Sequence, residues 1–213
     1  MATITKGILG GISGTIGTVV GANFRGKDIL RSRPKKSSKL PTEKQLLQQA
    51  KFKLVVQFMQ PLKFIQSRYF GQNSGAKSRV NLAVSYMLDN AISVVLGVPE
   101  LLYNKVLITK GDLAGFQNLT AAPVAGQKIE FNWVDNSLQG NASADDIVNV
   151  VCYSEDLGNF EIFQNIAVRG DLSAEMTLPL SYQAKAVSVW VYFNNTKENL
   201  ACNSNYVGLL TIL

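Results

Sequence analysis

The first 39 residues join a glycine-rich apolar segment to a basic one. Seven of the 17 glycines fall between residues 7 and 26, and the apolar residues among them are mostly β-branched. Such a segment has few large side chains, and glycine raises the entropic cost of ordering it. We therefore predict that it forms no core of its own and packs against another part of the chain or a neighbouring copy. The residues predicted to make a subunit interface here are Ile8, Ile12, Ile16, Val19 and Val20.

The glycine spacing also suggests a phosphate-binding loop, but the flanking residues argue against one. A Walker loop ends in Gly-Lys-Ser or Gly-Lys-Thr, whereas this segment has Gly17-Thr18-Val19. A dinucleotide-binding loop opens a helix, and residues 23–26 read Asn-Phe-Arg-Gly, which do not. We expect no nucleotide cofactor and favour a glycine-kinked packing arm.

The basic segment is predicted to be an extended arm, because Pro34, Ser37 and Ser38 disfavour a helix. Such an arm would bind phosphates without reading base sequence, or bind an acidic protein surface. A solvated linker is the other interpretation. The candidate binding residues are Arg25, Lys27, Arg31, Arg33, Lys35, Lys36 and Lys39.

The charge is strongly asymmetric along the chain. Residues 1–79 carry 15 lysines and arginines against two acidic residues, a net charge of +13, and residues 80–213 carry six against 13, a net charge of −7. Asymmetry of this size favours contact with a polyanion or with an acidic surface. The acidic half of a second copy would serve as such a surface.

Little in the sequence points to catalysis. The chain has no histidine, which removes the commonest general base and the commonest transition-metal ligand. The acidic pairs Asp145-Asp146 and Glu155-Asp156 fall in predicted turns, where solvated carboxylates are expected. We predict a protein that is not an enzyme and has no metal, cofactor or small-molecule substrate.

The sequence predicts synthesis in the cytosol, with no signal peptide and no membrane partner. No apolar run approaches the roughly 18 to 20 residues of a spanning helix, and the N-terminal apolar stretch is broken by glycines. Cys152 and Cys202 are accordingly expected to be reduced. Assembly into a virion or another particle is compatible with this location.

Residues 42–98 are predicted to be helical, following an arm at residues 1–41. Thr42 and Gln45 form a capping-box pattern, and Pro61 ends or kinks the first helix. A short helix is expected at residues 62–70, and a third at residues 77–95. The core stripe predicted for the first helix consists of Leu46, Leu47, Ala50, Leu54 and Phe58.

Residues 99–213 are predicted to form an antiparallel β-sandwich, which makes the fold class α+β. The apolar period changes to two near Pro99, with strands expected at residues 103–109, 128–134, 147–154, 160–164, 173–178, 186–193 and 206–212. Alternation places Trp133 inward. Trp190 and Tyr192 lie on the opposite face of their strand from Val191, so we expect them to contact the helical part or a partner subunit.

Three resemblances accompany these patterns. Residues 6–14, 17–21, 31–36, 41–45 and 205–208 resemble uncharacterised bacterial proteins of about this length that share a domain of unknown function. Residues 31–62 are more loosely similar to small phage structural proteins, and residues 128–134 and 187–193 to paired strands of fibronectin type III or immunoglobulin-like modules. The last resemblance concerns the fold and implies no activity.

Together these features predict a structural, self-assembling homo-oligomer, such as a capsid, tail or filament component of a phage virion, whose N-terminal arm laces subunits together. The alternative is a nucleic-acid-binding module that uses the basic arm, with Phe24, Phe52 and Tyr69 interleaved among basic residues.

Overall fold

The computed structural model describes residues 2–4, 10–24, 26–35, 39–73 and 77–213. The chain divides into two compact units, Met1–Glu43 and Lys44–Leu213. The helices and the sandwich, which the sequence suggested as separate segments at residues 42–98 and 99–213, share the second unit. Its composition of helices and mostly antiparallel sheets makes the fold α+β.

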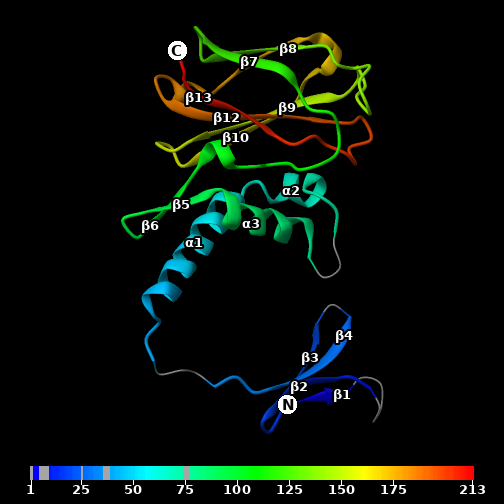
Figure 1. Cartoon of the computed structure of the whole chain (residues 1–213), viewed down its shortest axis with the longest axis vertical. Helices are drawn as coiled ribbons and strands as arrows, with labels where there is room; N and C mark the ends of the chain where they lie inside the picture. The colour runs from blue at the N-terminus through cyan, green and yellow to red at the C-terminus, as the bar shows by residue number, and fades with distance from the viewer. Residues whose placement is uncertain (1, 5–9, 25, 36–38, 74–76) are drawn as a thin grey trace. The chain divides into compact units, whose positions relative to one another are not determined.

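The first unit contains a small antiparallel sheet of its own. Its strands are β1 (Thr3–Ile4), β2 (Ile12–Ile16), β3 (Val19–Phe24) and β4 (Lys27–Ser32), and they neighbour one another in that order (Figure 1). The predicted extended arm therefore needs a correction, because the segment turns back and pairs with itself. The turn residues Gly17 and Gly26 both have positive φ, which explains how so short a segment reverses twice.

Gly21 shows why glycine is needed inside this sheet. A Cβ atom at Gly21 would lie 2.0 Å from the carbonyl oxygen of Ile12, where β2 crosses over β3. Among the described residues of this unit, Gly21 is also the only buried one. The segment forms a sheet but encloses almost no core, as its low content of large side chains predicts.

The second unit begins with helices α1 (Glu43–Met59), α2 (Lys63–Tyr69) and α3 (Arg79–Asn90). Their positions agree with the predicted helices, but the predicted core stripe of α1 is only partly right. Phe58 is buried, whereas Leu46 is 52% exposed. The buried residues of α1 are Val55, Phe58 and Met59, all in its C-terminal half.

The predicted third helix ends early. Residues 92–95 leave the helix and form β5 (Ile92–Val95), which pairs with β6 (Val98–Leu101) in a two-stranded hairpin. Leu96 and Gly97 occupy the turn with φ of 50° and 82°, the left-handed backbone that tight hairpin turns require. The β-branched run before Gly97 favours a strand over continuation of the helix.

Two antiparallel sheets form the sandwich. One has the strand order β10-β9-β12-β13, and the other β11-β8-β7. Their bounds are Gln117–Val124 (β7), Lys128–Val134 (β8), Ile147–Ser154 (β9), Asn159–Val168 (β10), Ser173–Thr177 (β11), Ala186–Asn194 (β12) and Asn205–Thr211 (β13). One-turn 3₁₀ helices occur at Tyr103–Lys105, Arg169–Asp171 and Leu180–Tyr182.

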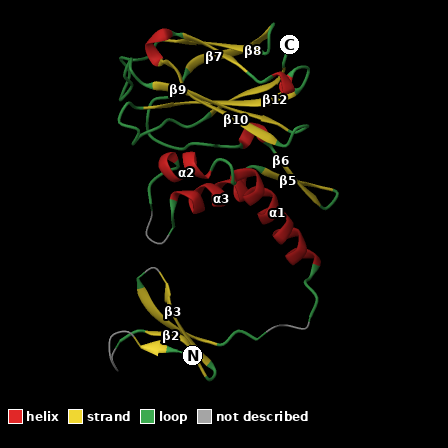
Figure 2. Ribbon diagram, turned by 180° about the vertical axis from the view of Figure 1, so that it is seen from behind, coloured by secondary structure: helices red, strands yellow, loops and turns green. Residues whose placement is uncertain are grey.

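The larger sheet is covered on both faces, which gives the second unit three layers (Figures 1 and 2). On the face toward the other sheet, Phe193 stacks on Phe116, with ring centroids 3.7 Å apart. On the opposite face, Trp190 contacts Phe58 of α1, with ring centroids 6.4 Å apart. Every residue of β12 after Ala186 is consequently buried.

Two parts of the strand prediction were wrong. Residues 103–109 were predicted as a strand but begin as the 3₁₀ helix Tyr103–Lys105, and the amide of Ile108 then donates to Ser204 Oγ at 2.8 Å. The strand β7, which contains Pro123, was not predicted. It lies at the edge of its sheet, where proline is tolerated because one side of the strand needs no hydrogen bonds.

Candidate functional site

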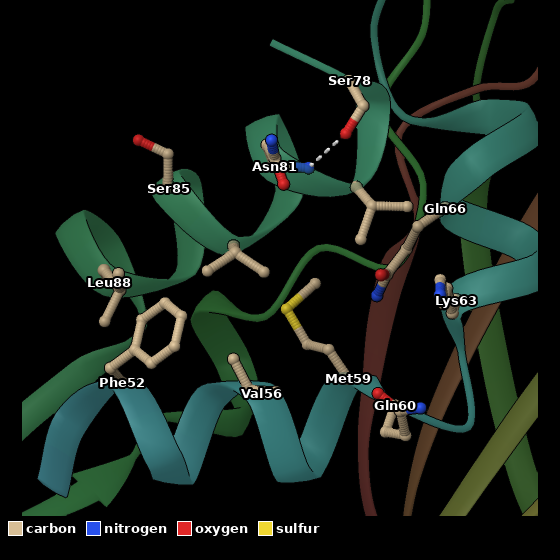
Figure 3. Close-up of a pocket in the computed structure, with 12 residues that line it drawn as sticks. Phe52, Val56, Met59, Gln60, Lys63, Gln66, Ser78, Asn81, Ser85 and Leu88 are labelled. Atoms are coloured by element: carbon tan, nitrogen blue, oxygen red, sulfur yellow. Dashed lines mark hydrogen bonds between the residues drawn. The ribbon is translucent and has the colours of Figure 1, made fainter. Parts of the chain in front are cut away.

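A groove with mostly apolar walls lies between α1 and α3 of the second unit. Its volume is about 740 Å³, and Figure 3 shows that side chains of both helices line it, with α2 at one end. Its apolar walls are formed by Phe52, Val56, Met59, Val80, Val84 and Leu88. The C-terminal half of α1 and the half-buried face of α3 thus bound a surface that a partner can enter.

The inner end of the groove holds a buried amide. Gln66 of α2 is 0% exposed, and neither its Oε1 nor its Nε2 atom has a hydrogen-bond partner among the residues that the structure describes. Its carboxamide points into the space between the helices, next to Met59 (Figure 3). A buried amide without partners costs roughly 1–3 kcal/mol, so a ligand that supplies both an acceptor and a donor would gain from this position.

The β5–β6 hairpin exposes apolar side chains. We define its tip as residues 94–98, and Figure 2 shows the hairpin projecting beside α1. Leu96 is 99% exposed, and Val94, Val95 and Val98 are also exposed. Glu100 is the one charged residue in β5, β6 and the turn between them. This hairpin was not predicted from the sequence, although β-branched residues around Leu96-Gly97 are a hairpin signal.

The predicted basic residues are divided between a strand and the chain that follows it. Lys27 and Arg31 lie on one face of β4, because they are paired with Phe24 and Val20 of β3. Arg33, Lys35 and Lys39 follow β4, and the amide of Arg33 donates to the carbonyl of Thr18 at 2.7 Å. Arg25 and Lys36 lie outside the described residues.

The predicted apolar interface residues lie mostly on the other face of this small sheet. Ile16 and Val19 are directly paired and share that face with Ile12 and with Leu30. Ile16 is 51% exposed and Leu30 is 64% exposed. Val20 lies on the face of Lys27 and Arg31, and Ile8 lies outside the described residues. The structure thus separates the basic residues of β4 from a face that carries these apolar residues together with Asp28 and Asn23.

Trp190 and Tyr192 are not at a free surface. Both are 0% exposed, and they pack on aromatic rings of the helical part of the same chain. The sequence predicted that these two residues contact either the helical part or a partner subunit. In the structure they contact the helical part. Their assignment to a subunit interface is therefore corrected.

Asp146 is a second correction, since the sequence suggested a solvated carboxylate. Its Oδ2 atom lies 2.9 Å from Nη2 of Arg169, and both side chains are buried. Arg169 also donates to the carbonyls of Ala114 and Gly115, and its guanidinium carbon lies 3.8 Å from the centroid of Phe193. Because its donors meet acceptors within the chain, this cluster is structural.

A polar cavity of about 740 Å³ lies beside α2 and the start of α3. Three of its lining residues are cations, but protein groups already engage them. Arg68 pairs with Glu198 at 2.5 Å, Arg79 donates to the backbone carbonyl of Arg68, and Lys110 lies over the ring of Tyr86. A carboxylate thus neutralises Arg68, whereas Arg79 and Lys110 contact groups that carry no net charge.

The thiols have the environment of core residues. Cys152 and Cys202 are free and buried. Burial raises the pKa of both, that of Cys202 to about 12, so they are neutral and unreactive near pH 7.

In the described ranges, no group of three or more acidic or cysteine side chains could hold a metal ion. Among the same residues, no helix combines the length and apolar character needed to cross a bilayer.

Comparison with known proteins assigns a family but no activity. No curated protein matches the chain. A family model matches residues 11–208, which include most of the N-terminal sheet, the helices and nearly all of the sandwich. The chain therefore belongs to the family of unknown function DUF6266.

Proposed function

We propose that this chain is a structural protein that assembles with copies of itself, as a component of a virion or a virion-like particle such as a capsid, tail or filament. The observation that carries the proposal is the N-terminal sheet, which leaves apolar side chains exposed on both faces. Ile16, Phe24 and Leu30 are 51%, 57% and 64% exposed. Exposed apolar patches of this kind are typical of surfaces that a partner covers.

The edge of the same sheet supports this proposal. In the described part of the unit, β4 pairs only with β3, so one side of β4 has backbone groups available to another strand. Edge strands readily add a strand from a second chain, and main-chain hydrogen bonds then supply affinity. Subunits laced together by their N-terminal segments would bury the apolar face and pair this edge.

Electron microscopy and sedimentation velocity of the full chain test the proposal. We expect rings, shells or filaments, with an assembled fraction that rises with protein concentration. Replacing Ile16 and Leu30 together by threonine should reduce assembly, because threonine is β-branched and suits a strand but makes that face polar. Ile29→Thr, on the opposite face, is the matched control. A full chain that stays monomeric at all concentrations would contradict the proposal.

Nucleic-acid binding is a second candidate, favoured by the other face of the sheet. There Lys27 and Arg31 alternate with Ile29, and Phe24 is paired with Lys27. Basic and aromatic side chains on one sheet face suit single-stranded nucleic acid. Replacing Lys27 and Arg31 by glutamine should lower the affinity for a single-stranded oligonucleotide and reduce its salt dependence. An unchanged salt dependence would contradict this candidate.

We further propose that the sandwich belongs to the immunoglobulin-like group, in the fibronectin type III arrangement. In support, counted from β7, the first, second and fifth strands form one sheet, and the third, fourth, sixth and seventh form the other. A constant immunoglobulin domain differs in placing its fourth strand with the first, second and fifth. Superposition of an experimental structure on both types would decide the assignment.

A further inference from the structure

We propose that the tip of the β5–β6 hairpin of one copy inserts into the groove between α1 and α3 of a second copy. This contact rests on the self-assembly proposed above and names a surface for it outside the N-terminal sheet.

The groove calls for a polypeptide occupant. Its walls are apolar, so an occupant gains by burying apolar side chains there. The carboxamide of Gln66 has both a donor and an acceptor without partners. A hydrocarbon chain would leave both unsatisfied, whereas a peptide group carries one N–H and one C=O and can satisfy both.

The hairpin tip supplies these groups in the same chain. Residues 94–98 read Val-Val-Leu-Gly-Val, and Leu96, at 99% exposure, is the most exposed large apolar residue described. The peptide groups at Leu96 and Gly97 lie at the end of the hairpin, beyond the β5–β6 pairing. A two-residue turn also presents them at low entropic cost, because the strands already hold it in shape.

The charges near these two surfaces are complementary. Lys63 lines the groove at the start of α2 and is exposed. Glu100, in β6, is exposed and is the one charged residue of the hairpin. An inserted tip would bring one negative charge to the side of a groove that carries one positive charge, which favours one orientation over its reverse.

The contact would be heterologous, because the tip and the groove are formed by different residues. Each copy carries one tip and one groove, so each copy can bind two neighbours. Such head-to-tail contacts produce a ring where the rotation between copies closes and a filament where it does not. The inference therefore adds a propagating interface to an assembly that the N-terminal sheet alone would otherwise mediate.

Variants of the tip and the groove test the inference in the full-length chain. Leu96→Asn removes the apolar side chain but preserves the turn, since Asn-Gly is the preferred sequence for this backbone. Phe52→Glu places a charge in the groove at a helical position that is already half exposed. We expect each to weaken self-association, measured by sedimentation velocity, by about tenfold or more.

Two controls accompany these variants. Leu138→Asn makes the same chemical change at a residue that is 98% exposed and lies outside both surfaces, and it should leave association within about twofold of wild type. Lys63→Glu should weaken association about two- to fivefold, and adding Glu100→Lys should restore it. Circular dichroism of each variant verifies that the fold is retained.

Cross-linking identifies the contact directly. Chains carrying Leu96→Cys are mixed with chains carrying Ser85→Cys in the groove wall, and a short bismaleimide is added. The native thiols are buried and should therefore not react with the reagent. The expected product is a covalent dimer of the two variants. Dimers formed only between two Leu96→Cys chains, or no dimer at all, would overturn the inference.

The association measurements distinguish a failure of this inference from a failure of the proposed function. If wild type assembles but Leu96→Asn, Phe52→Glu and Leu138→Asn assemble equally well, the inference fails while the proposed function stands. A monomeric wild type would overturn both.

Discussion

The carboxylate of Asp146 and the guanidinium of Arg169 form an ion pair inside the sandwich, with 2.9 Å between Oδ2 and Nη2 and side-chain exposures of 3% and 0%. Three further side chains contact Arg169. The indole of Trp133 donates to the backbone carbonyl of Arg169 at 2.8 Å, Asn136 accepts from the guanidinium, and Phe193 lies under it. One buried cation thus ties both sheets to the loop at residues 114–115.

Breaking this pair should be costly. Asp146→Asn keeps the shape of the side chain but leaves the Arg169 charge uncompensated in the interior, and we expect the free energy of unfolding to fall by about 3–5 kcal/mol. Urea denaturation followed by circular dichroism measures this change. Glu175→Gln is the matched control, because its pair with Lys128 is largely exposed; it should cost less than about 1 kcal/mol. Equal losses of unfolding free energy in the two variants would show that the buried pair stabilises the fold no more than the exposed pair does.

Trp190 should matter to the core as much as Trp133 does. Both side chains are buried, and Trp190 packs on Phe58 of α1, on Tyr103 and on Tyr206. Truncating either tryptophan to alanine should lower the free energy of unfolding by about 3–5 kcal/mol.

The two tryptophan variants should differ in where the chain loosens. Trp190→Ala removes a contact between the sheet and α1, so limited proteolysis should cut near the C-terminal end of α1 before it cuts the sandwich. Trp133→Ala should not accelerate cleavage of α1. The same cleavage order in both variants would contradict the layer assignment.

Stability should decrease in alkaline solution. Burial raises the pKa of Cys202 from an ordinary value near 9 to about 12, and that of Tyr182 from 10 to about 12. Between the unfolded and the folded pKa, the folded state holds a proton that the unfolded state has lost, so the free energy of unfolding falls as pH rises. This contribution is fully present below pH 9 and is lost progressively toward pH 12.

Urea midpoints at pH 7, 9, 10 and 11 measure this dependence. Cys202→Ala and Tyr182→Phe should each flatten the decline, since neither new side chain ionises. Tyr182→Phe should be nearly neutral at pH 7, because the Tyr182 hydroxyl is buried and has no hydrogen-bond partner in the described part of the chain. A decline as steep in both variants as in the wild type would contradict this assignment.

Gly21 should be required for the N-terminal sheet. Gly21→Ala introduces a Cβ atom 2.0 Å from the carbonyl oxygen of Ile12, so β2 must move off β3. We expect faster hydrogen exchange at the amides of β2 and β3, with the second unit unaffected. Ala22→Val adds larger bulk on the opposite face and improves strand propensity, so its exchange should match wild type or slow. Unchanged exchange in Gly21→Ala would contradict the crossing of β2 over β3.

Several features of the fold could be predicted from the sequence because they are local. Alternation identified β8 and β12, the spacing of turn residues identified β9, helical spacing identified α1 to α3, and the scarcity of large side chains predicted a segment without a core. Each depends on residues within about ten positions of one another. The family assignment follows likewise from sequence and agrees with the resemblance in the N-terminal motifs.

Of the candidate site, the sequence identified only the N-terminal residues, and it missed the groove and the hairpin tip. Val94 and Val95 fit a helical face as well as a strand, and the pairing with β6 decides between them. Gln66 is polar and gives no signal by itself; its importance comes from burial without a partner.

The sequence by itself determined which residues share a strand face, and only the tertiary structure decided what covers that face. Alternation along β12 is enough to predict that Trp190 and Tyr192 lie on the opposite face from Val191. They are core residues because α1 and α2 cover that face. Asp146 is adjacent to Asp145 in a turn, but Arg169, 23 positions later, makes it a buried ion-pair partner. Burial depends on contacts between distant segments, and the local periodicity of a sequence does not specify those contacts.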